Sequence, residues 1–292
     1  MQLDLPTTLL VLLAAAMHAT WNALVKFERD RLVAIALING AGVVLGAGLL
    51  CVVPPLRPEA WAYLVPSFVL QSGYMGVLML AYRAGDLSQV YPVARGTGPL
   101  GVILISALAE SRVPPVFEWL GVGAVSLGIL SLAWRRPRPR LPGQPPGSWR
   151  GIAYAVCCGL LISVYTVLDS RGVRLGGSPL AYGGWIFVLY GLPWVAVALA
   201  RRSREPGGWK PLRPEARHWR LALGAGSLCF AAYLLAVWAL SRGAAAPVSA
   251  LRETSVIFAA LIGTLLLKEP FGPRRVLAAA LVALGVVLIR IG

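Results

Sequence analysis

The chain has 292 residues, of which 58% are hydrophobic and 13% charged, and its mean hydropathy is +0.72. Soluble domains carry about 25% charged residues and disordered chains need low hydrophobicity, so both classes are excluded. The formal net charge of +15 would suggest nucleic acid in a soluble protein. Here most Lys and Arg residues lie in short breaks between apolar blocks, where membrane topology accounts for them. We therefore expect no nucleic-acid partner.

The apolar blocks predict ten membrane-spanning helices, because a helix needs about 20 residues to cross a bilayer. In chain order the expected spans are residues 7–25, 32–53, 61–82, 88–109, 116–134, 151–169, 179–200, 220–240, 245–266 and 273–290. The sequence thus predicts an all-α polytopic membrane protein that is surrounded by the lipid bilayer.

The spans divide into two predicted five-helix repeats, residues 1–134 and 151–292, joined by a Pro/Arg-rich linker loop at 135–150. An offset of 157 residues aligns several positions of the two halves: Arg95 with Arg252, Thr97 with Thr254, and Leu127-Gly128 with Leu284-Gly285. Because each half has an odd number of helices, the halves must be inverted relative to each other. Inverted repeats with a binding site at their interface are typical of secondary transporters.

Lys and Arg residues are distributed unequally between the two sides of these spans. Nineteen lie in the loops of one side, and six lie on the side that carries both termini. Positive residues accumulate in cytoplasmic loops, so we expect both termini outside the cytoplasm and the protein in the inner cell membrane.

Two arginines, Arg95 and Arg252, lie about eight residues inside their predicted spans, roughly 12 Å deep at 1.5 Å per residue. An arginine at the bilayer centre costs about 2.5–3.5 kcal/mol or more, and such residues face a protein interior or a water-filled cavity. Two interpretations are open. The arginines bind an anionic group of a substrate, or each is paired internally with an acid or with backbone carbonyls.

Arg95 is surrounded by four helix-weakening residues: Pro92, Gly96, Gly98 and Pro99. Proline removes a helical hydrogen bond, and glycine lowers the cost of unusual dihedral angles. The pattern predicts a broken helix that lines a cavity, and a proline kink that serves packing is the alternative. Tyr91 lies one turn before Arg95 on the same face and is a further candidate for substrate binding.

Two acidic residues are candidates for coupling or for neutralising the arginines. Glu253 directly follows Arg252, and either titrates during transport or stays a permanent counter-ion. Asp169 is at the end of the predicted sixth span, and its alternative role there is an interfacial anchor or a local ion pair. It shares a helix face with Tyr165, and both are retained as site candidates because the sixth span corresponds to the first in the repeat.

The first span carries a polar stripe of His18, Trp21 and Asn22, which we expect to face the interior of the bundle. There it contacts substrate or supplies hydrogen bonds between helices. His218 is the only other histidine, and no paired carboxylates or metal-ligand motif accompany either. We therefore expect no enzyme, no metal site and no cofactor, and the lack of a Walker-type motif argues against ATP hydrolysis.

The five-plus-five plan and three segments resemble the drug/metabolite transporter superfamily, EamA branch: His18-Ala-Thr-Trp21-Asn22, Gly85-Asp-Leu-Ser-Gln-Val-Tyr-Pro-Val-Ala-Arg95-Gly and Lys268-Glu269-Pro270. The resemblance covers essentially the whole chain and implies an EamA-like ten-helix transporter. Many such proteins are expected to have cytoplasmic termini, and the Lys and Arg distribution here indicates the reverse.

These observations together predict a secondary active transporter that works by alternating access through a central cavity between the repeats. Two arginines and one adjacent glutamate favour a small polar substrate that is anionic or zwitterionic. Protons are the candidate coupling ion, and a homodimer stays open as the oligomeric state. The alternative is a lipid-linked carrier flippase, or a flippase subunit, of the same fold.

Overall fold

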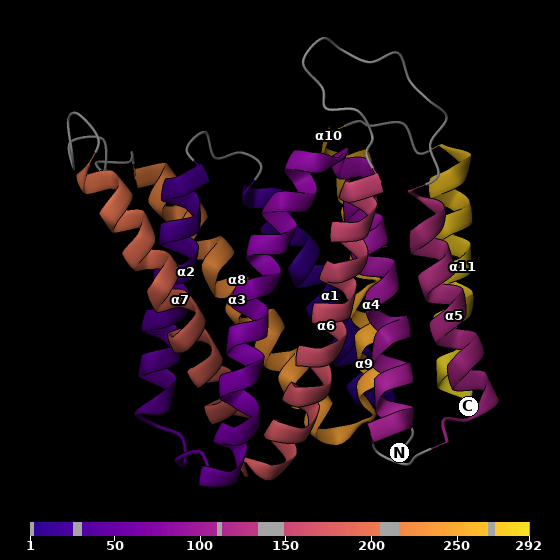
Figure 1. The fold of residues 1–292 in the computed structure, drawn as a ribbon, viewed down its shortest axis with the longest axis horizontal. Helices are drawn as coiled ribbons and strands as arrows, with labels where there is room; N and C mark the ends of the chain where they lie inside the picture. Colours follow the sequence, from indigo (N-terminus) through magenta and orange to yellow (C-terminus); the bar gives the residue numbers. More distant parts are fainter. Residues whose placement is uncertain are drawn as a thin grey trace.

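The computed structural model describes residues 3–25, 31–109, 113–133, 149–204, 216–267 and 272–291, and no strand occurs among them. The chain folds into a bundle of roughly parallel and antiparallel helices (Figure 1). In chain order the helices are α1 (Leu5–Val25), α2 (Arg31–Leu50), η1 (Pro58–Ala60), α3 (Trp61–Ala84), α4 (Leu87–Ala109), α5 (Val116–Ser131), α6 (Trp149–Leu175), α7 (Pro179–Ser203), α8 (Ala216–Arg242), α9 (Ala245–Arg252), α10 (Ser255–Leu267) and α11 (Pro273–Ile291).

The predicted all-α fold with ten crossings is confirmed, and the chain is a multi-pass membrane protein. Each predicted span contains one α-helix, except the ninth, which consists of α9 followed by α10. Within the described residues, seven segments are long and apolar enough to cross a membrane, and Ala36–Leu50 and Val116–Ser131 are shorter apolar helices.

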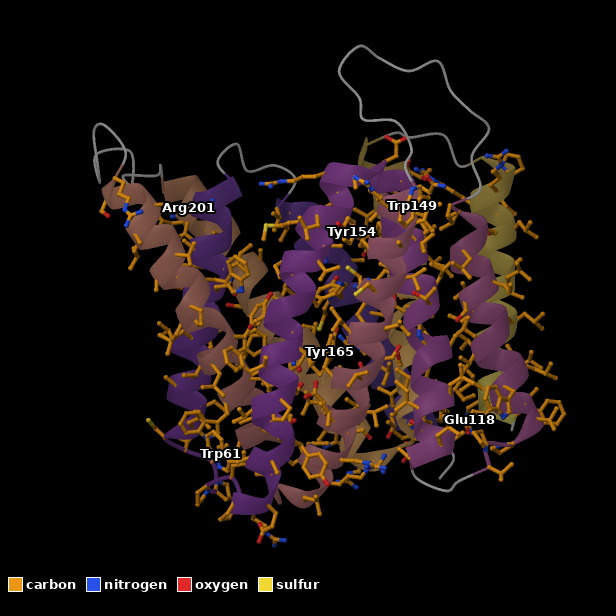
Figure 2. All side chains as sticks on the ribbon, in the orientation of Figure 1. Trp61, Glu118, Trp149, Tyr154, Tyr165 and Arg201 are labelled. Carbon is orange, nitrogen blue, oxygen red and sulfur yellow. The ribbon has the colours of Figure 1, made fainter. Side chains whose placement is uncertain are left out.

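Both described chain ends lie at one face of the bundle, where α1 begins and α11 ends (Figure 1). We call this the terminal face. Asp4 caps α1 there, because its Oδ1 accepts the Thr7 N–H at 2.9 Å. Hydrogen bonds from Thr7 lower the pKa of the Asp4 carboxyl. Helix α6 begins at Trp149 on the opposite face (Figure 2).

Several helix pairs connect the two predicted halves, among them α1 on α8, α3 on α6, α2 on α7 and α5 on α11. A pseudo-twofold axis between the halves would exchange the first two pairs and map each of the other two onto itself. The packing therefore fits the five-plus-five plan, while the boundaries at residues 134 and 151 stay a prediction. Of the predicted linker 135–150, residues 135–148 lie outside the described residues, as does Lys268-Glu269-Pro270, whereas Trp149 and Arg150 belong to α6.

Helix α4 is continuous from its first to its last residue, which contradicts the predicted break around Arg95. Pro92 and Pro99 both lie inside it. Such prolines are tolerated when neighbouring helices and Ser or Thr side chains satisfy the backbone groups. The Ser163 side-chain oxygen of α6 lies 2.9 Å from the carbonyl oxygen of Gly98, so α6 packs directly against the backbone of α4 beside Pro99.

The glycines beside Arg95 serve close packing instead. A Cβ atom on Gly96 would lie 2.7 Å from Cγ of Leu130 in α5, and one on Gly98 would lie 3.2 Å from Cγ2 of Ile162 in α6. These two contacts press α4 against both neighbours and hold it helical. The alternative interpretation of the sequence, a packing role for the proline and glycine residues, agrees with the structure.

The interior is closed on the side of the terminal face. Every residue from Ala245 to Leu251 in α9 is buried, and Leu64, Tyr182 and Leu240 of the same hydrophobic core are at most 2% exposed. Nearer the opposite face, polar and aromatic side chains of α1 and α4 keep partial exposure: Trp21, Asn22 and Tyr91. The bundle is thus sealed more tightly on its terminal side.

Candidate functional site

The ninth span is broken at a polar run that the sequence had placed inside one helix. Helix α9 ends at Arg252 and α10 begins at Ser255. Between them the Thr254 N–H bonds to the Leu251 carbonyl at 3.1 Å, three residues back, and the Thr254 hydroxyl donates to the same oxygen at 2.7 Å. This tightened turn interrupts the α-helical hydrogen bonding and presents Arg252 and Glu253 at membrane depth.

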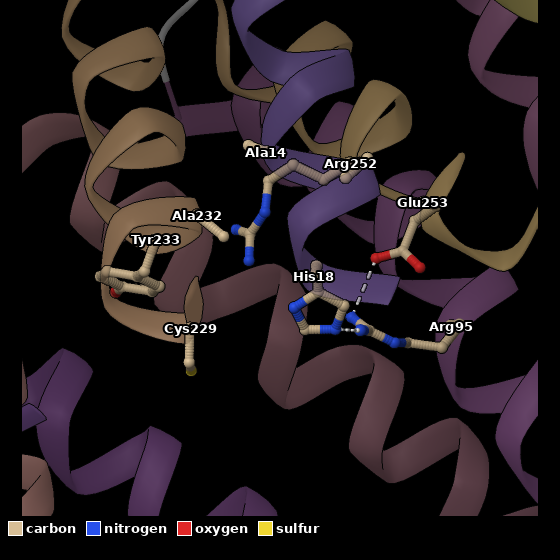
Figure 3. Close-up of a pocket in the computed structure, with 9 residues that line it drawn as sticks. Ala14, His18, Arg95, Cys229, Ala232, Tyr233, Arg252 and Glu253 are labelled. Atoms are coloured by element: carbon tan, nitrogen blue, oxygen red, sulfur yellow. Dashed lines mark hydrogen bonds and ion pairs between the residues drawn. The ribbon is translucent and has the colours of Figure 1, made fainter. Parts of the chain in front are cut away.

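A cavity of about 90 Å³ lies at this break, bounded by α1, α4, α8 and the ninth span. Its lining residues are Ala14, Ala15, His18, Arg95, Cys229, Ala232, Tyr233, Arg252 and Glu253 (Figure 3). Pockets for drug-sized ligands measure roughly 300–1,000 Å³. The observed volume therefore suits a small group, such as one carboxylate with a few adjoining atoms.

Arg95 is paired within the protein. Its NH1 group contacts Oε1 of Glu253 at 3.0 Å, and its NH2 group lies 2.9 Å from Nε2 of His18 (Figure 3). The Tyr91 hydroxyl lies 3.4 Å from Nε of the same guanidinium. The Arg95 and Glu253 side chains are only 12% and 5% exposed, so this is a buried ion pair between the fourth and ninth spans.

His18 lies between two groups that can only donate hydrogen bonds. Its Nε2 faces Arg95 at 2.9 Å, and its Nδ1 faces the indole N–H of Trp21 at 3.3 Å. A neutral imidazole has one acceptor nitrogen and one N–H, so it can accept from only one of them. The shorter contact assigns the acceptor to Nε2. Asn22 donates to the His18 carbonyl at 2.8 Å within α1, and neither Trp21 nor Asn22 lines the cavity.

Arg252 differs from Arg95 because its charge has no such partner. Within the described residues, its guanidinium makes no hydrogen bond or ion pair. Its Cζ lies 5.9 Å from the ring centroid of Tyr233. Figure 3 shows the guanidinium of Arg252 extending into the space between Tyr233 and His18. The last turn of a helix favours a positive side chain, yet this position also leaves the guanidinium free to bind an anion.

Glu253 uses only one of its two carboxylate oxygens. Oε1 binds Arg95, whereas Oε2 is buried and has no hydrogen-bond partner. A buried acceptor without a partner costs about 1–3 kcal/mol or more. The cavity wall thus contains an unsatisfied acceptor beside the uncompensated donors of Arg252.

Asp169 is buried, 2% exposed, in a cluster of hydroxyl groups from three other helices. Its Oδ1 accepts from Ser67 of α3 at 2.5 Å and from Tyr182 of α7 at 3.0 Å. Its Oδ2 accepts from Tyr233 of α8 at 3.1 Å. Gln71 extends the cluster by donating to the Ser67 oxygen at 3.0 Å. Helix α6 continues past Asp169 to Leu175, so this residue does not end the span as predicted.

The remaining site candidates lie around the cavity rather than in its wall. Tyr91 contacts Arg95, with the guanidinium carbon 5.6 Å from its ring centroid. Tyr165 packs against Tyr74 of α3, with ring centroids 6.4 Å apart, and its position near the middle of the bundle is visible in Figure 2. Among the described residues, no group of three metal-binding side chains occurs.

Sequence reasoning missed Tyr233, which contacts both Arg252 and Asp169 and thereby joins the cavity to the hydroxyl cluster. Tyr233 lies inside the eighth predicted span. Tyr91 was selected as a polar aromatic residue inside a span, and the same criterion would have selected Tyr233. Ser67 and Tyr182 were missed because nothing in a single sequence indicates that their hydroxyls converge on an acid more than ten residues away.

Comparison with known proteins identifies the family. Residues 149–291 match the model of the EamA-like transporter family, so the second half of the chain belongs to this family of membrane transporters and the predicted resemblance is confirmed. No curated protein matches the chain. A solved crystal structure shares its fold, with a TM-score of 0.72 and 19% identity over 97% of this chain and 96% of the other.

Proposed function

We propose that the chain is a secondary active transporter of a small anionic or zwitterionic metabolite, with Arg252 as the anion-binding residue. The observation that carries the proposal is the guanidinium of Arg252, which extends into the cavity without a direct ion pair among the described residues. An arginine without a direct ion pair at membrane depth costs about 2.5–3.5 kcal/mol or more. A ligand that brings a carboxylate or phosphate oxygen to this group would recover that cost.

The geometry supports different roles for the two arginines. Arg95 is already held by Glu253 and His18, so Glu253 acts as its counter-ion in this state. Arg252 presents a planar fork of donors that matches a carboxylate or phosphate in a bidentate manner. In this proposal, the side chains that line the cavity are supported from behind its wall by Tyr91, Trp21, Asn22 and Tyr165. Alternating access then exposes the cavity first on one face and afterwards on the other.

The ligand-binding prediction compares two arginines that both lie over aromatic rings. We expect Arg252→Gln to weaken binding of a small carboxylate by about 1.5–3 kcal/mol, the range for hydrogen bonds to charged groups. Thermal-shift titration of the purified protein with acetate, glycine and larger organic acids measures this, since ligands that bind the folded state raise its melting temperature.

Arg242→Gln is the matched control. Arg242 is exposed, and its guanidinium carbon lies 5.2 Å from the ring centroid of Trp238, but it does not line the cavity. Unchanged ligand affinity in Arg252→Gln would contradict the proposal. Stabilisation by lipid-linked carriers alone, and by none of the small solutes, would favour the flippase alternative.

The topology prediction concerns the orientation in an inner membrane. If both termini are extracytoplasmic, a cysteine introduced at Gln144 lies in the cytoplasm and stays unlabelled by an impermeant thiol reagent in intact cells. Gln144 is outside the described residues, and the expectation rests on the Lys and Arg distribution. A cysteine at Glu59, an exposed residue beside the terminal face, should be labelled. Labelling at Gln144 and protection at Glu59 would reverse the orientation.

A further inference from the structure

Four charged groups in and beside the cavity form two unequal pairs. Arg95 and Glu253 are in direct contact at 3.0 Å. Arg252 and Asp169 carry the other two charges and do not touch, because Tyr233 lies between them: its ring faces Arg252 and its hydroxyl donates to Asp169 at 3.1 Å. With both acids ionised, the four groups sum to zero.

Among the described residues around Asp169, Arg252 is the cation that compensates it, because on the same helix Arg171 donates to the Ala109 carbonyl and Arg174 to the Gly243 carbonyl. Helix α3 contributes the neutral Ser67 and Gln71, and α7 and α8 contribute the hydroxyls of Tyr182 and Tyr233. On its own helix, Tyr165 lies one turn before it. The ninth span contributes Arg252, which acts on Asp169 electrostatically, and α4 contributes only Arg95, which Glu253 already holds.

Anion binding at Arg252 would disturb this balance. A ligand carboxylate takes over the positive charge that compensates Asp169, so the buried groups would carry one net negative charge. Excess charge in a low-dielectric interior is expensive. One proton on Asp169 restores neutrality: a ligand carboxylate and a proton enter together, the proton bonds to Oδ2, and the Tyr233 hydroxyl turns to accept it. No covalent bond of the ligand changes.

We propose that Asp169 is the proton-binding site of this transporter, and that an anionic ligand on Arg252 and a proton on Asp169 bind together through Tyr233. The inference rests on the proposed function, because it requires the ligand at Arg252. It assigns the coupling role to Asp169 and leaves Glu253 as the counter-ion of Arg95. Coupling of this kind is reciprocal, so the ligand favours protonation as much as the proton favours ligand binding.

The test measures acetate affinity from pH 6 to pH 9, where acetate itself stays ionised. If one proton is taken up with the ligand, the affinity of the wild-type protein should fall by up to about tenfold per pH unit above the titration range of Asp169. In weakly buffered solution, adding acetate should also raise the pH. Asp169→Asn should bind acetate with little pH dependence and without proton uptake.

Three further variants decide between the acids. Glu253→Gln should keep the wild-type slope, and Glu59→Gln, which removes an exposed carboxyl outside the bundle, should change nothing. Tyr233→Phe retains the ring beside Arg252 but removes one donor from Asp169, so it should shift the pH dependence to higher pH. This variant keeps the test valid if Asp169→Asn fails to fold.

The possible results separate the inference from the proposed function. A wild-type slope in Asp169→Asn, an unshifted profile in Tyr233→Phe, or a slope lost only in Glu253→Gln would overturn the assignment to Asp169. Binding that depends on Arg252 but not on pH would overturn the coupling and leave the proposed function standing. If no small carboxylate binds through Arg252, the proposed function fails, and this inference fails with it.

Discussion

Replacing Arg95 with methionine is expected to lower the free energy of unfolding by about 3–5 kcal/mol, the cost of breaking a buried ion pair by removing one partner. Methionine fills much of the same space, so the loss would come from charge. Oε1 of Glu253 would lose its cation, while Oε2 already has no hydrogen-bond partner. Nε2 of His18 would also lose its hydrogen-bond donor. Denaturant titration of the purified protein measures the change.

The double variant Arg95→Met/Glu253→Gln is the control, because it removes both charges. We expect it to regain a large part of the lost stability, since replacing a whole buried pair is often close to neutral. Arg252→Met should lose far less than Arg95→Met, because no ion pair is broken. Equal stability of Arg95→Met and the wild-type protein would show that the pair does not hold the fourth and ninth spans together.

A second large effect on stability is expected from Gly121→Val, which would force α5 and α11 apart. A Cβ atom on Gly121 would lie 2.8 Å from the carbonyl oxygen of Gly285 and 2.6 Å from a side-chain carbon of Ile289. The backbone of α11 cannot give way without moving the helix. Overpacking of this kind costs about 1–3 kcal/mol and occasionally more, and close helix contact in membranes depends on such small residues.

Gly123→Val is the matched control, two residues further along α5, because a Cβ atom there would have no neighbour within 4 Å. The melting temperatures of the two variants in the same detergent provide the comparison. Gly121→Val should melt clearly below the wild-type protein, and Gly123→Val close to it. If both variants behave alike, the contact between α5 and α11 is looser than the structure indicates.

Much of the fold could be predicted from the sequence because hydropathy alone reports which segments enter the membrane. Ten spans and the positions of Arg95 and Arg252 follow from it. The end of the sixth helix did not, because charged residues after Asp169 close the apolar window while the helix itself continues. The guanidinium of Arg174 donates hydrogen bonds to the carbonyls of Leu240 and Gly243. A single sequence does not indicate these partners.

The helix break was predicted in the wrong span for a related reason. Pro92 and Pro99 weaken a helix locally, but contacts of Gly96 and Gly98 with α5 and α6 keep α4 continuous. The break occurs instead at Glu253, in a run without proline or glycine. The pairing of the charges was equally hidden, because which acid meets which arginine depends on how side chains from distant helices approach each other.

The two-part ninth span has a mechanical consequence. After Glu253, the N–H groups of Thr254 and Val256 bond three residues back instead of four, so this point can act as a hinge with few regular helical hydrogen bonds to break. Helix α9, on one side of the hinge, is buried and closes the terminal side of the interior. Glu253 at the hinge forms an ion pair with Arg95 of α4, and this pair restrains the hinge. A rotation of α9 about this hinge would open the terminal side of the interior and break the Arg95–Glu253 ion pair. The same rotation would move Arg252 away from Tyr233.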